Sequence, residues 1–329
     1  MKLSIIIPVL NGGQSFKLCL ENIQSGNRRP DELIIVIDGH DPDSATLAQT
    51  YTDKVIINPQ TYGPAFARNI GVQQATGDII VFFDADVTVH EDTLQKIKTY
   101  FEQHPDVGAL MGSYDDAPAD SHFLSQYKNL MHHYVHQTSN RKASTFWGAC
   151  GAIRREVFLD IGGFDEGYTR PCIEDIELGY RLSAQGHIIH LVPDIQIKHH
   201  KQWTARKLLE SDIRDRAIPW SHLILTQNQL VNDLNIDTKS RISTIIIYLL
   251  VLTLLISFLM PPLVGLVITW GCILFWLNRD IYRFLYSHRG VLFLIRSLFW
   301  HWLYYLYSGL TFLGVWSYIH LQAFTAEQN

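Results

Sequence analysis

The sequence predicts a mostly parallel α/β domain followed by membrane-spanning helices. The first two-thirds of the chain alternate short apolar runs with segments of helical periodicity, as in a doubly wound parallel sheet. The last third is strongly apolar and contains runs close to the ~20 residues that cross a bilayer. The 329-residue chain has a formal net charge of −5, so we expect no nucleic-acid partner.

The cysteines and the N-terminus indicate the compartment. Cys19, Cys150, Cys172 and Cys272 are scattered and form no C-x-x-C motif. We therefore expect reduced thiols and no zinc site. The apolar run at the N-terminus is too short for a signal peptide and is broken by Pro8, so the α/β domain is expected to stay in the cytosol.

Apolar runs at residues 4–9, 33–37 and 55–57 predict the first buried strands. The second of these strands ends in Asp38. Right-handed crossovers between parallel strands would bring Asp38 and Asp84 to the same edge of the sheet.

The stretch from Ile79 to Val87 is the most informative in the chain. Five apolar residues, typical of a buried strand, run directly into Asp84-Ala85-Asp86. Ligands of open α/β sheets bind at the carboxyl ends of strands. Two carboxylates there suit Mg²⁺, which takes one or two carboxylates together with substrate phosphates. The alternative is a solvated turn, in which Asp is also common.

The middle of the chain predicts one more strand at residues 106–111, a polar loop at 113–120 and a helical run at 122–136. That run contains His132, His133 and His136. No carboxylate or cysteine lies among them at ligand spacing, so we predict no metal centre there.

The order of motifs resembles the N-terminal half of family 2 glycosyltransferases, which have the Rossmann-like GT-A fold. It comprises a strand with Pro and a nearby Asn, a strand ending in Asp, Ala-Arg-Asn-x-Gly at 67–71, and Gly-Asp at 77–78 before the strand into Asp-x-Asp. The resemblance covers residues 3–200. It implies that Asp84 and Asp86 hold a divalent metal and the diphosphate, and it implies a nucleotide site formed by Pro8, Asn11, Asp38, Arg68 and Asp84.

Two departures from the family patterns matter. After the second strand the family often has two acidic residues followed by Gly-Ser, whereas this chain has Asp38-Gly39-His40-Asp41, which affects base recognition. Processive polysaccharide synthases carry Gln-x-x-Arg-Trp, whereas this chain has Arg216-Ala-Ile-Pro-Trp220. The second departure argues against a processive synthase.

Two further segments fit the same resemblance. Residues 147–158 and the Gly-Gly-Phe-Asp turn at 162–165 look like the family's small-residue strand and turn, where a sugar can approach the backbone; a tight turn without a ligand is the alternative. Glu174-Asp175 opens a helix, where carboxylates also serve as caps. In the family this pair supplies the catalytic base, and its second residue matches Asp175.

A predicted strand at 195–197 runs into His199-His200. Many GT-A enzymes place a histidine here as an additional metal or diphosphate contact. His199 matches that position best, and His200 is the second choice. The alternative is that both histidines lie on the surface and bind no ligand.

Residues 204–240 form a predicted linker, in which residues 204–218 are either an interfacial helix or an amphipathic helix against the domain. Residues 241–329 form a predicted membrane domain with about three spans, at 242–260, 263–277 and 297–321. Five basic residues fall in the predicted connection before the third span, namely Arg279, Arg283, His288, Arg289 and Arg296.

Basic connections stay in the cytosol, so the C-terminus is expected outside, unless the third segment is re-entrant. We therefore expect an integral membrane protein, of the bacterial inner membrane, with residues 1–203 as a cytoplasmic GT-A domain.

Together these patterns predict an inverting glycosyltransferase that moves a sugar from a nucleotide-sugar donor to a lipid-linked or membrane-associated acceptor. Mg²⁺ or Mn²⁺ on Asp84 and Asp86 would neutralise the leaving diphosphate, and Asp175 would act as general base beside Glu174. If the acceptor is a polyprenyl phosphate, its phosphate is the nucleophile and needs no base.

Two other functions remain as alternatives. A non-catalytic membrane scaffold subunit is disfavoured by the intact Asp-x-Asp and Glu-Asp pairs. A sugar-phosphate nucleotidyltransferase is disfavoured because residues 8–13 lack that class's Gly-rich loop with a basic residue.

Overall fold

The computed structural model describes residues 1–227 and 230–326. The chain divides into two compact units, unit 1 (Met1–Trp203) and unit 2 (Thr204–Asn329).

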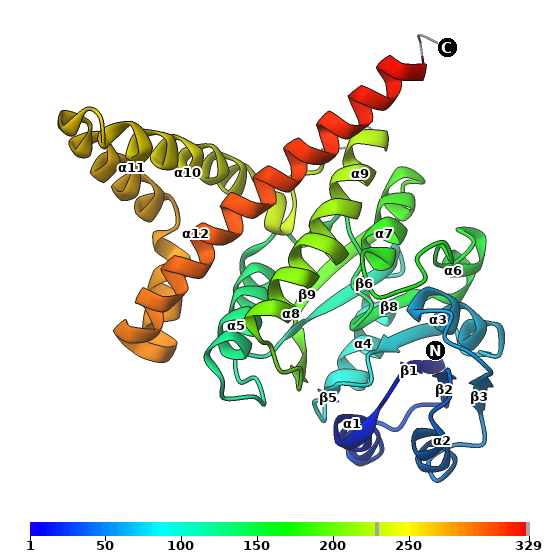
Figure 1. Ribbon diagram of the computed structural model, residues 1–329. Helices are drawn as coiled ribbons and strands as arrows, with labels where there is room; N and C mark the ends of the chain where they lie inside the picture. The colour runs from blue at the N-terminus through cyan, green and yellow to red at the C-terminus, as the bar shows by residue number, and fades with distance from the viewer. Residues whose placement is uncertain (228–229, 327–329) are drawn as a thin grey trace. The chain divides into compact units, whose positions relative to one another are not determined.

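Unit 1 is built on one mixed, mostly parallel sheet of nine strands (Figure 1). The strands are β1 (Leu3–Val9), β2 (Glu32–Asp38), β3 (Val55–Asn58), β4 (Ile79–Phe83), β5 (Val87–Val89), β6 (Val107–Tyr114), β7 (Lys142–Ala143), β8 (Cys150–Arg154) and β9 (Ile188–His199). Their order is β3-β2-β1-β4-β8-β6-β9-β5, with β7 paired to β9. Strand β8 runs antiparallel between β4 and β6, while β3, β2, β1 and β4 are parallel.

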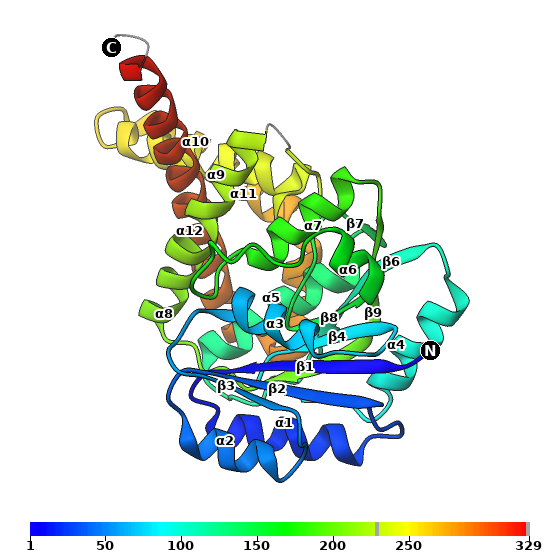
Figure 2. The same cartoon turned by 90° about the vertical axis from the view of Figure 1, so that its right-hand side faces the viewer.

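Helices cover both faces of the sheet, which explains why β1, β2 and β4 are apolar at almost every position. The helices of unit 1 are α1 (Gly13–Ser25), α2 (Pro42–Gln49), α3 (Pro64–Gln73), α4 (Thr93–Gln103), α5 (Phe123–Thr138), α6 (Arg155–Asp160) and α7 (Glu174–Ala184). Alternate residues of β1 separate the two layers: Ile5 and Ile7 pack with α1, whereas Ile6 faces Gly71 of α3. Figure 2 shows α1 and α2 on one side of strands β1–β3 and α3 on the other.

One prediction needs adjustment in this unit. The strand expected at 106–111 extends to Tyr114, so the segment 113–120 begins as strand rather than loop. Helix α2 begins at Pro42, where the Asp41 side chain caps it by accepting from the Ser44 amide at 3.1 Å.

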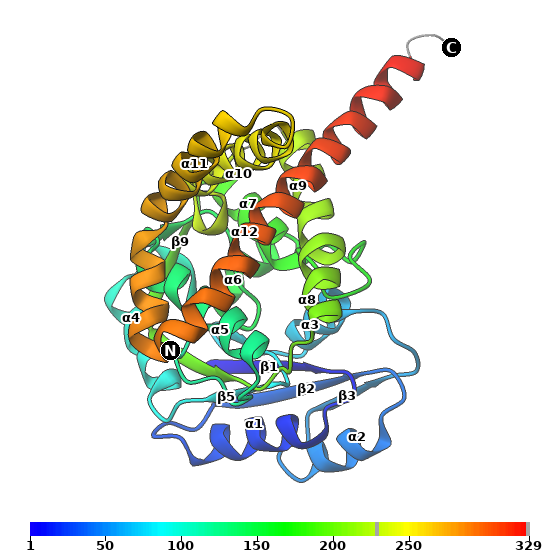
Figure 3. The ribbon, with the colours of Figure 1, turned by 60° about the vertical axis from the view of Figure 1, so that its left-hand side comes forward.

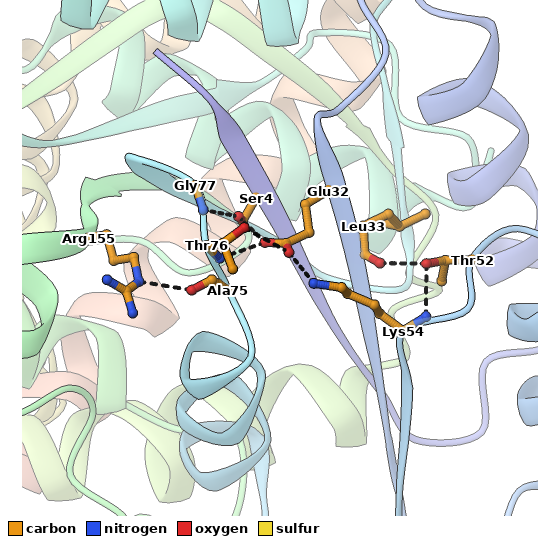
Figure 4. A network of polar contacts seen from close by, with 9 residues as sticks. All are labelled: Ser4, Glu32, Leu33, Thr52, Lys54, Ala75, Thr76, Gly77 and Arg155. Atoms are coloured by element: carbon orange, nitrogen blue, oxygen red, sulfur yellow. Dashed lines mark hydrogen bonds and ion pairs between the residues drawn. The ribbon is translucent and has the colours of Figure 1, made fainter.

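A polar network stabilises the edge of the sheet opposite to the carboxyl ends of β1 and β2 (Figure 4). Glu32, at the start of β2, accepts hydrogen bonds from Ser4, from Lys54 and from the Thr76 amide, the last at 2.8 Å. Burial acts to raise the pKa of Glu32, but these three donors lower it to about 2. The network therefore ties β1, β2 and the turn before β4 through one ionised carboxylate.

Unit 2 is helical. Its elements are α8 (Ala205–Glu210), the π-helical turn η1 (Ser211–Ala217), α9 (Ile218–Gln227), the 3₁₀ turns η2 (Leu234–Ile236) and η3 (Pro261–Leu263), α10 (Thr238–Ser257), α11 (Val264–Leu277) and α12 (Arg279–Ala326). The segment predicted as one helix at 204–218 is thus α8 followed by a π-helical turn. Helices α10 and α11 run side by side (Figure 3), joined through Pro261-Pro262.

Three membrane spans are not shown by the described residues. Within residues 1–227 and 230–326, α10 is the one helix that is long and apolar enough to cross a membrane, and η3–α11 with α12 would add one span only as a pair bent by 72°. Helix α11 has 14 residues and so a length of about 21 Å, which is short for a bilayer. The basic connection expected before the third span is helical from Arg279 to Arg289, and α12 is interrupted at Gly290.

Candidate active site

The candidate site lies where β4 ends. Asp84 and Asp86 fill the gap between β4 and β5, as the sequence predicts, and their side chains are 36% and 41% exposed. Pro8 and Asn11 lie at the corresponding end of β1, which pairs with β2 on one side and β4 on the other. The residues expected around a nucleotide therefore share one edge of the sheet.

Arg68 joins two parts of this edge. It projects from α3, is 4% exposed, and donates from Nη2 to Asp84 Oδ1 at 2.7 Å and from Nη1 to Glu174 Oε1 at 2.8 Å. Burial acts to lower the pKa of Arg68, but Asp84, Glu174 and Asp175 raise it, so the guanidinium stays charged. Arg68 thus fixes the Asp-x-Asp turn relative to the start of α7.

Gly148 leaves room for this guanidinium. A Cβ at position 148 would lie 3.0 Å from the Cζ and Nη2 atoms of Arg68. The Gly148 amide also donates to Asp175 Oδ2 at 2.9 Å. The small residue before β8 therefore contacts both the arginine and the predicted base.

Glu174 and Asp175 differ in surroundings. Glu174 is buried and uses both carboxylate oxygens inside the protein, one with Arg68 and one with the Cys172 amide at 2.9 Å. Asp175 is half-buried. Of the pair, Asp175 is the more exposed carboxylate.

His199, rather than His200, faces the carboxylate of Asp86. The His199 Nε2 atom lies 3.7 Å from Asp86 Oδ2, and the ring stacks on Tyr114 at a centroid distance of 4.4 Å. His200 donates its backbone amide to the Asp86 carbonyl at 2.9 Å, and its ring hydrogen-bonds to Thr88. Burial opposes ionisation of Asp86, yet His199 and Lys201 keep its pKa below the ordinary value.

The donor types present, carboxylate oxygen and imidazole nitrogen, suit a divalent cation. However, the described residues contain no group of three or more His, Cys, Asp or Glu side chains arranged to hold a metal. Asp84 is engaged by Arg68, and burial together with Asp86 and Glu174 raises its pKa. A metal here would need further oxygen ligands from a bound substrate.

Asp38 ends β2 and is held by donors from within the protein. It is 4% exposed and accepts from Asn58 Nδ2 at 2.9 Å and from the amides of Tyr62 and Gly63 at 3.1 and 2.8 Å. These bonds hold the turn that leads into α3 and Arg68. Asp41, by contrast, holds the loop after β1 through the Gly12 amide at 3.2 Å.

Tyr114 escaped the sequence reasoning as a residue of this region, whereas Trp147 and Gly148 were expected here only as part of the small-residue segment at 147–158. Tyr114 ends a buried strand, and Trp147 meets its ring edge-on at 4.7 Å. The only sequence signal was the small-residue segment that begins at Trp147, which does not reveal its neighbours.

The class of protein follows from comparison with known families. Residues 4–162 match the family model described as glycosyl transferase family 2, and residues 129–203 match the model described as N-terminal domain of galactosyltransferase. An uncharacterized glycosyltransferase of Haemophilus influenzae is 33% identical over 211 residues, which is 60% of this chain and 82% of that protein. The chain belongs to the family 2 glycosyltransferases, which confirms the family predicted from its motifs.

More distant proteins extend the comparison. The glucosyl-dolichyl phosphate glucuronosyltransferase of Haloferax volcanii is 24% identical over 186 residues, 52% of this chain and 58% of that protein. The chain spans 18% and 30% of the length of two other relatives. The mannosyltransferase PcManGT from Pyrobaculum calidifontis, solved in complex with GDP-Man and Mn²⁺, matches with a TM-score of 0.55 and 18% identity over 95% of this chain and 87% of that one. At this identity the likeness concerns the fold alone.

Proposed function

We propose that the protein transfers a sugar, with inversion at the anomeric carbon, from a nucleotide-sugar donor to a lipid-linked acceptor. The observation that carries the proposal is the double ion pair of Arg68, which joins the Asp-x-Asp turn to the Glu174-Asp175 pair. Donor-binding and proton-accepting groups thereby lie on either side of one buried guanidinium.

Asp84 and Asp86 would hold the donor through a divalent cation, Mg²⁺ or Mn²⁺, with His199 as a further contact. The cation supplies positive charge that neutralises the leaving diphosphate. Arg68 keeps the Asp84 carboxylate oriented, and Pro8, Asn11 and Asp38 line or support the nucleotide end. The Mn²⁺ complex of the Pyrobaculum mannosyltransferase supports this choice of cofactor.

Asp175 would take the proton of an acceptor hydroxyl as the new glycosidic bond forms. Its Oδ2 accepts from the Gly148 amide, which orients the carboxylate, and Oδ1 accepts from the Ile176 amide at 2.8 Å. Attack opposite to the leaving diphosphate inverts the configuration. Glu174, held by Arg68 and the Cys172 amide, acts as a positioning residue.

A polyprenyl phosphate acceptor is the second candidate. The name of the Haloferax relative includes a dolichyl phosphate, and α10 would place unit 2 in the membrane where such a lipid resides. A lipid phosphate is already a nucleophile and needs no base. We place unit 1 on the cytoplasmic side of that membrane, with α10 as the spanning helix.

The first experiment measures binding of a panel of nucleoside diphosphates to the detergent-solubilised full chain, with and without Mn²⁺ or Mg²⁺. We expect metal-dependent binding of one diphosphate that is lost in Asp86→Ala. The matched control is Asp92→Ala, an aspartate whose side chain is 50% exposed and pairs with Lys96 of α4 at 2.8 Å. Failure of every diphosphate to bind folded protein would overturn the donor site and favour a non-catalytic scaffold.

Asp175→Asn then separates the two acceptors. With a hydroxyl acceptor, transfer from labelled donor to membrane lipid extract should fall by about 10²–10⁴-fold, the usual contribution of a general base. Nearly unchanged transfer would exclude the hydroxyl mechanism and support attack by a lipid phosphate. Diphosphate binding should stay unchanged in either case, since Asp175 lies outside the proposed metal ligands.

A further inference from the structure

Unit 1 contains a polar groove that takes no part in the candidate active site. The groove has a volume of about 540 Å³, within the range typical of small-molecule sites, and lies between α4 and the middle of β9. On the strand side its wall is a bulge: β6 advances by two residues after Met111, whereas β9 advances by five after Leu191, before the two strands pair again. The extra residues of β9 line the groove opposite α4.

The groove is separate from the reaction centre. Helix α4 packs through Leu94 into the same core layer as α1, whereas Arg68 projects from α3, on the opposite face of the sheet (Figure 2). Along β9, Asp194 in the groove precedes His199 by five residues, or about 16 Å of extended strand. A ligand in the groove would therefore not use the residues proposed to bind the donor.

A hydrogen-bond hub at Tyr100 fixes an arginine at the groove. Arg141 donates from Nε and Nη2 to the Tyr100 hydroxyl at 3.2 and 2.9 Å, and its Cζ atom lies 5.5 Å from the centre of the tyrosine ring. The same hydroxyl lies 2.7 Å from His190 Nδ1, and because its lone pairs accept from Arg141, its proton is donated to that nitrogen. Burial, Arg141 and His104 lower the pKa of His190, which keeps the ring a neutral acceptor. Arg141 is thus held by a tyrosine instead of a carboxylate, and its Nη1 atom donates to none of the residues that the structure describes.

The groups that line the groove are balanced in charge and mixed in hydrogen-bonding type. The Lys, Arg, Asp and Glu side chains among them are two cations and two anions, Lys96, Arg141, Asp92 and Asp194. Lys96 is already paired, with the Asp92 carboxylate at 2.8 Å and the Asp194 carbonyl at 2.9 Å. The side chains of Asp194 and Gln103 are exposed and make no hydrogen bond within residues 1–227 and 230–326. The groove therefore offers a guanidinium that only donates, a carboxylate that only accepts and an amide that does both.

We propose that this groove binds a neutral saccharide, a function beyond the proposed sugar transfer. Sugar hydroxyls both donate and accept hydrogen bonds, so one ligand can use the guanidinium, the carboxylate and the amide together. An anionic ligand would lie beside two aspartates, and a cationic ligand beside Arg141, each with like-charge repulsion. The C–H faces of a sugar ring suit the apolar side chains of Val192 and Pro193, which line the same bulge.

The test titrates maltose, cellobiose and lactose into the full chain, solubilised in a detergent without a sugar headgroup. Saturation-transfer difference NMR measures the affinity for each disaccharide, and digalacturonic acid serves as the anionic counterpart. We expect a neutral disaccharide to bind, and digalacturonic acid to bind more weakly. The groove variant Gln103→Ala, Asp194→Ala should bind the neutral disaccharide about 5- to 150-fold more weakly, because it loses two hydrogen bonds that contribute about 2- to 12-fold each.

The matched control is Gln49→Ala, Asp53→Ala, which removes the same two kinds of side chain from exposed positions outside the groove. Its affinity for the disaccharide should equal that of wild type, and melting temperatures show that both variants are folded. The proposal is overturned if none of the three disaccharides binds, if the groove variant binds as tightly as wild type, or if digalacturonic acid binds more tightly than they do.

Two further measurements separate this site from the proposed function. The disaccharide should bind Asp86→Ala as it binds wild type, and loss of binding there would place the saccharide at the reaction centre and refute the groove. Metal-dependent diphosphate binding should be equal in the groove variant and in wild type, whereas its absence from wild type would refute the donor site alone. With disaccharide binding lost in the groove variant, weaker transfer to lipid extract would support a glycan of the acceptor as the ligand, and unchanged transfer would support a free saccharide.

Discussion

Replacing Gly148 by alanine tests whether the position of Arg68 determines donor binding. The added Cβ would lie 3.0 Å from Cζ and Nη2 of Arg68, well inside ordinary carbon–carbon contact. The guanidinium has little freedom to retreat, because it is bound to Asp84 and Glu174 and lies 5.4 Å from the ring centre of Phe164. We therefore expect the alanine variant to lengthen the bond to Asp84.

The expected loss of nucleoside diphosphate affinity follows from the strength of the hydrogen bond that is weakened. A hydrogen bond between charged groups contributes about 1.5–3 kcal/mol, which corresponds to roughly a 10- to 150-fold loss of affinity if donor binding depends on it. Calorimetry of the preferred nucleoside diphosphate in the presence of Mn²⁺ measures this directly. The melting temperature, recorded in parallel, shows whether the variant remains folded.

Gly108→Ala is the control. Position 108 also lies in the sheet of unit 1, but a Cβ there would meet its nearest neighbour at 3.5 Å, an ordinary contact. The affinity of Gly108→Ala for the nucleoside diphosphate should match that of wild type. Wild-type affinity in Gly148→Ala would refute the reasoning that Arg68 sets the geometry of Asp84.

Three further predictions concern buried charges. Arg68→Met should lower the free energy of unfolding by about 3 kcal/mol and abolish donor binding, because it leaves Asp84 and Glu174 without their cation; a variant as stable as wild type in thermal melts would contradict this. Asp38→Asn should lower the free energy of unfolding by about 1–3 kcal/mol, because the amide cannot accept all the hydrogen bonds that the carboxylate accepts. Weaker donor binding at an unchanged melting temperature would point instead to a direct contact between Asp38 and the nucleotide. Glu32→Gln should remove about 2 kcal/mol at pH 7, a value reduced for the solvent exposure of Lys54. Because the folded pKa of Glu32 lies below the unfolded one, that advantage is complete above pH 4.5 and disappears as pH falls toward 2, so the difference in melting temperature between wild type and Glu32→Gln should shrink in acid.

The sheet, and the edge at which Asp38 and Asp84 lie, were predictable from local sequence. Strands β1, β2 and β4 are buried on both faces, so they read as unbroken apolar runs, and Asp38 and Asp84 mark where two of them end. The side of the sheet on which such residues gather follows from the handedness of crossovers. Local pattern and global topology agree here, which is why the prediction was accurate.

The pairings within the site were not predictable in the same way. Arg68 and Glu174 are separated by 106 positions, and nothing near either residue indicates the other. The donors around the Asp38 carboxylate likewise come from a turn about 20 residues away, and nothing in the sequence beside Asp38 indicates them. Such contacts depend on how distant segments pack, which periodicity does not encode.

Hydropathy had a different weakness in unit 2. It identified the apolar segments but not the 72° bend between α11 and α12, because the bend follows from a short break at Asn278 rather than from composition. It also assigned the basic residues before Gly290 to a connection between spans, although they lie in a helix. The three expected spans stay a prediction, since the described residues show one candidate span, or two if the bent pair counts as one.

The reversed direction of β8 has a consequence for how substrate preference can change among related enzymes. Because β8 is antiparallel to β4, Cys150 lies opposite Phe83, and the segment entering β8 meets the segment leaving β4. Within the segment that enters β8, Thr145, Phe146 and Ala149 are buried and Gly148 is fixed by its closeness to Arg68, whereas Trp147 is only partly buried. A change of side chain at Trp147, with Gly148 kept, is therefore the natural route to alter what the proposed site binds.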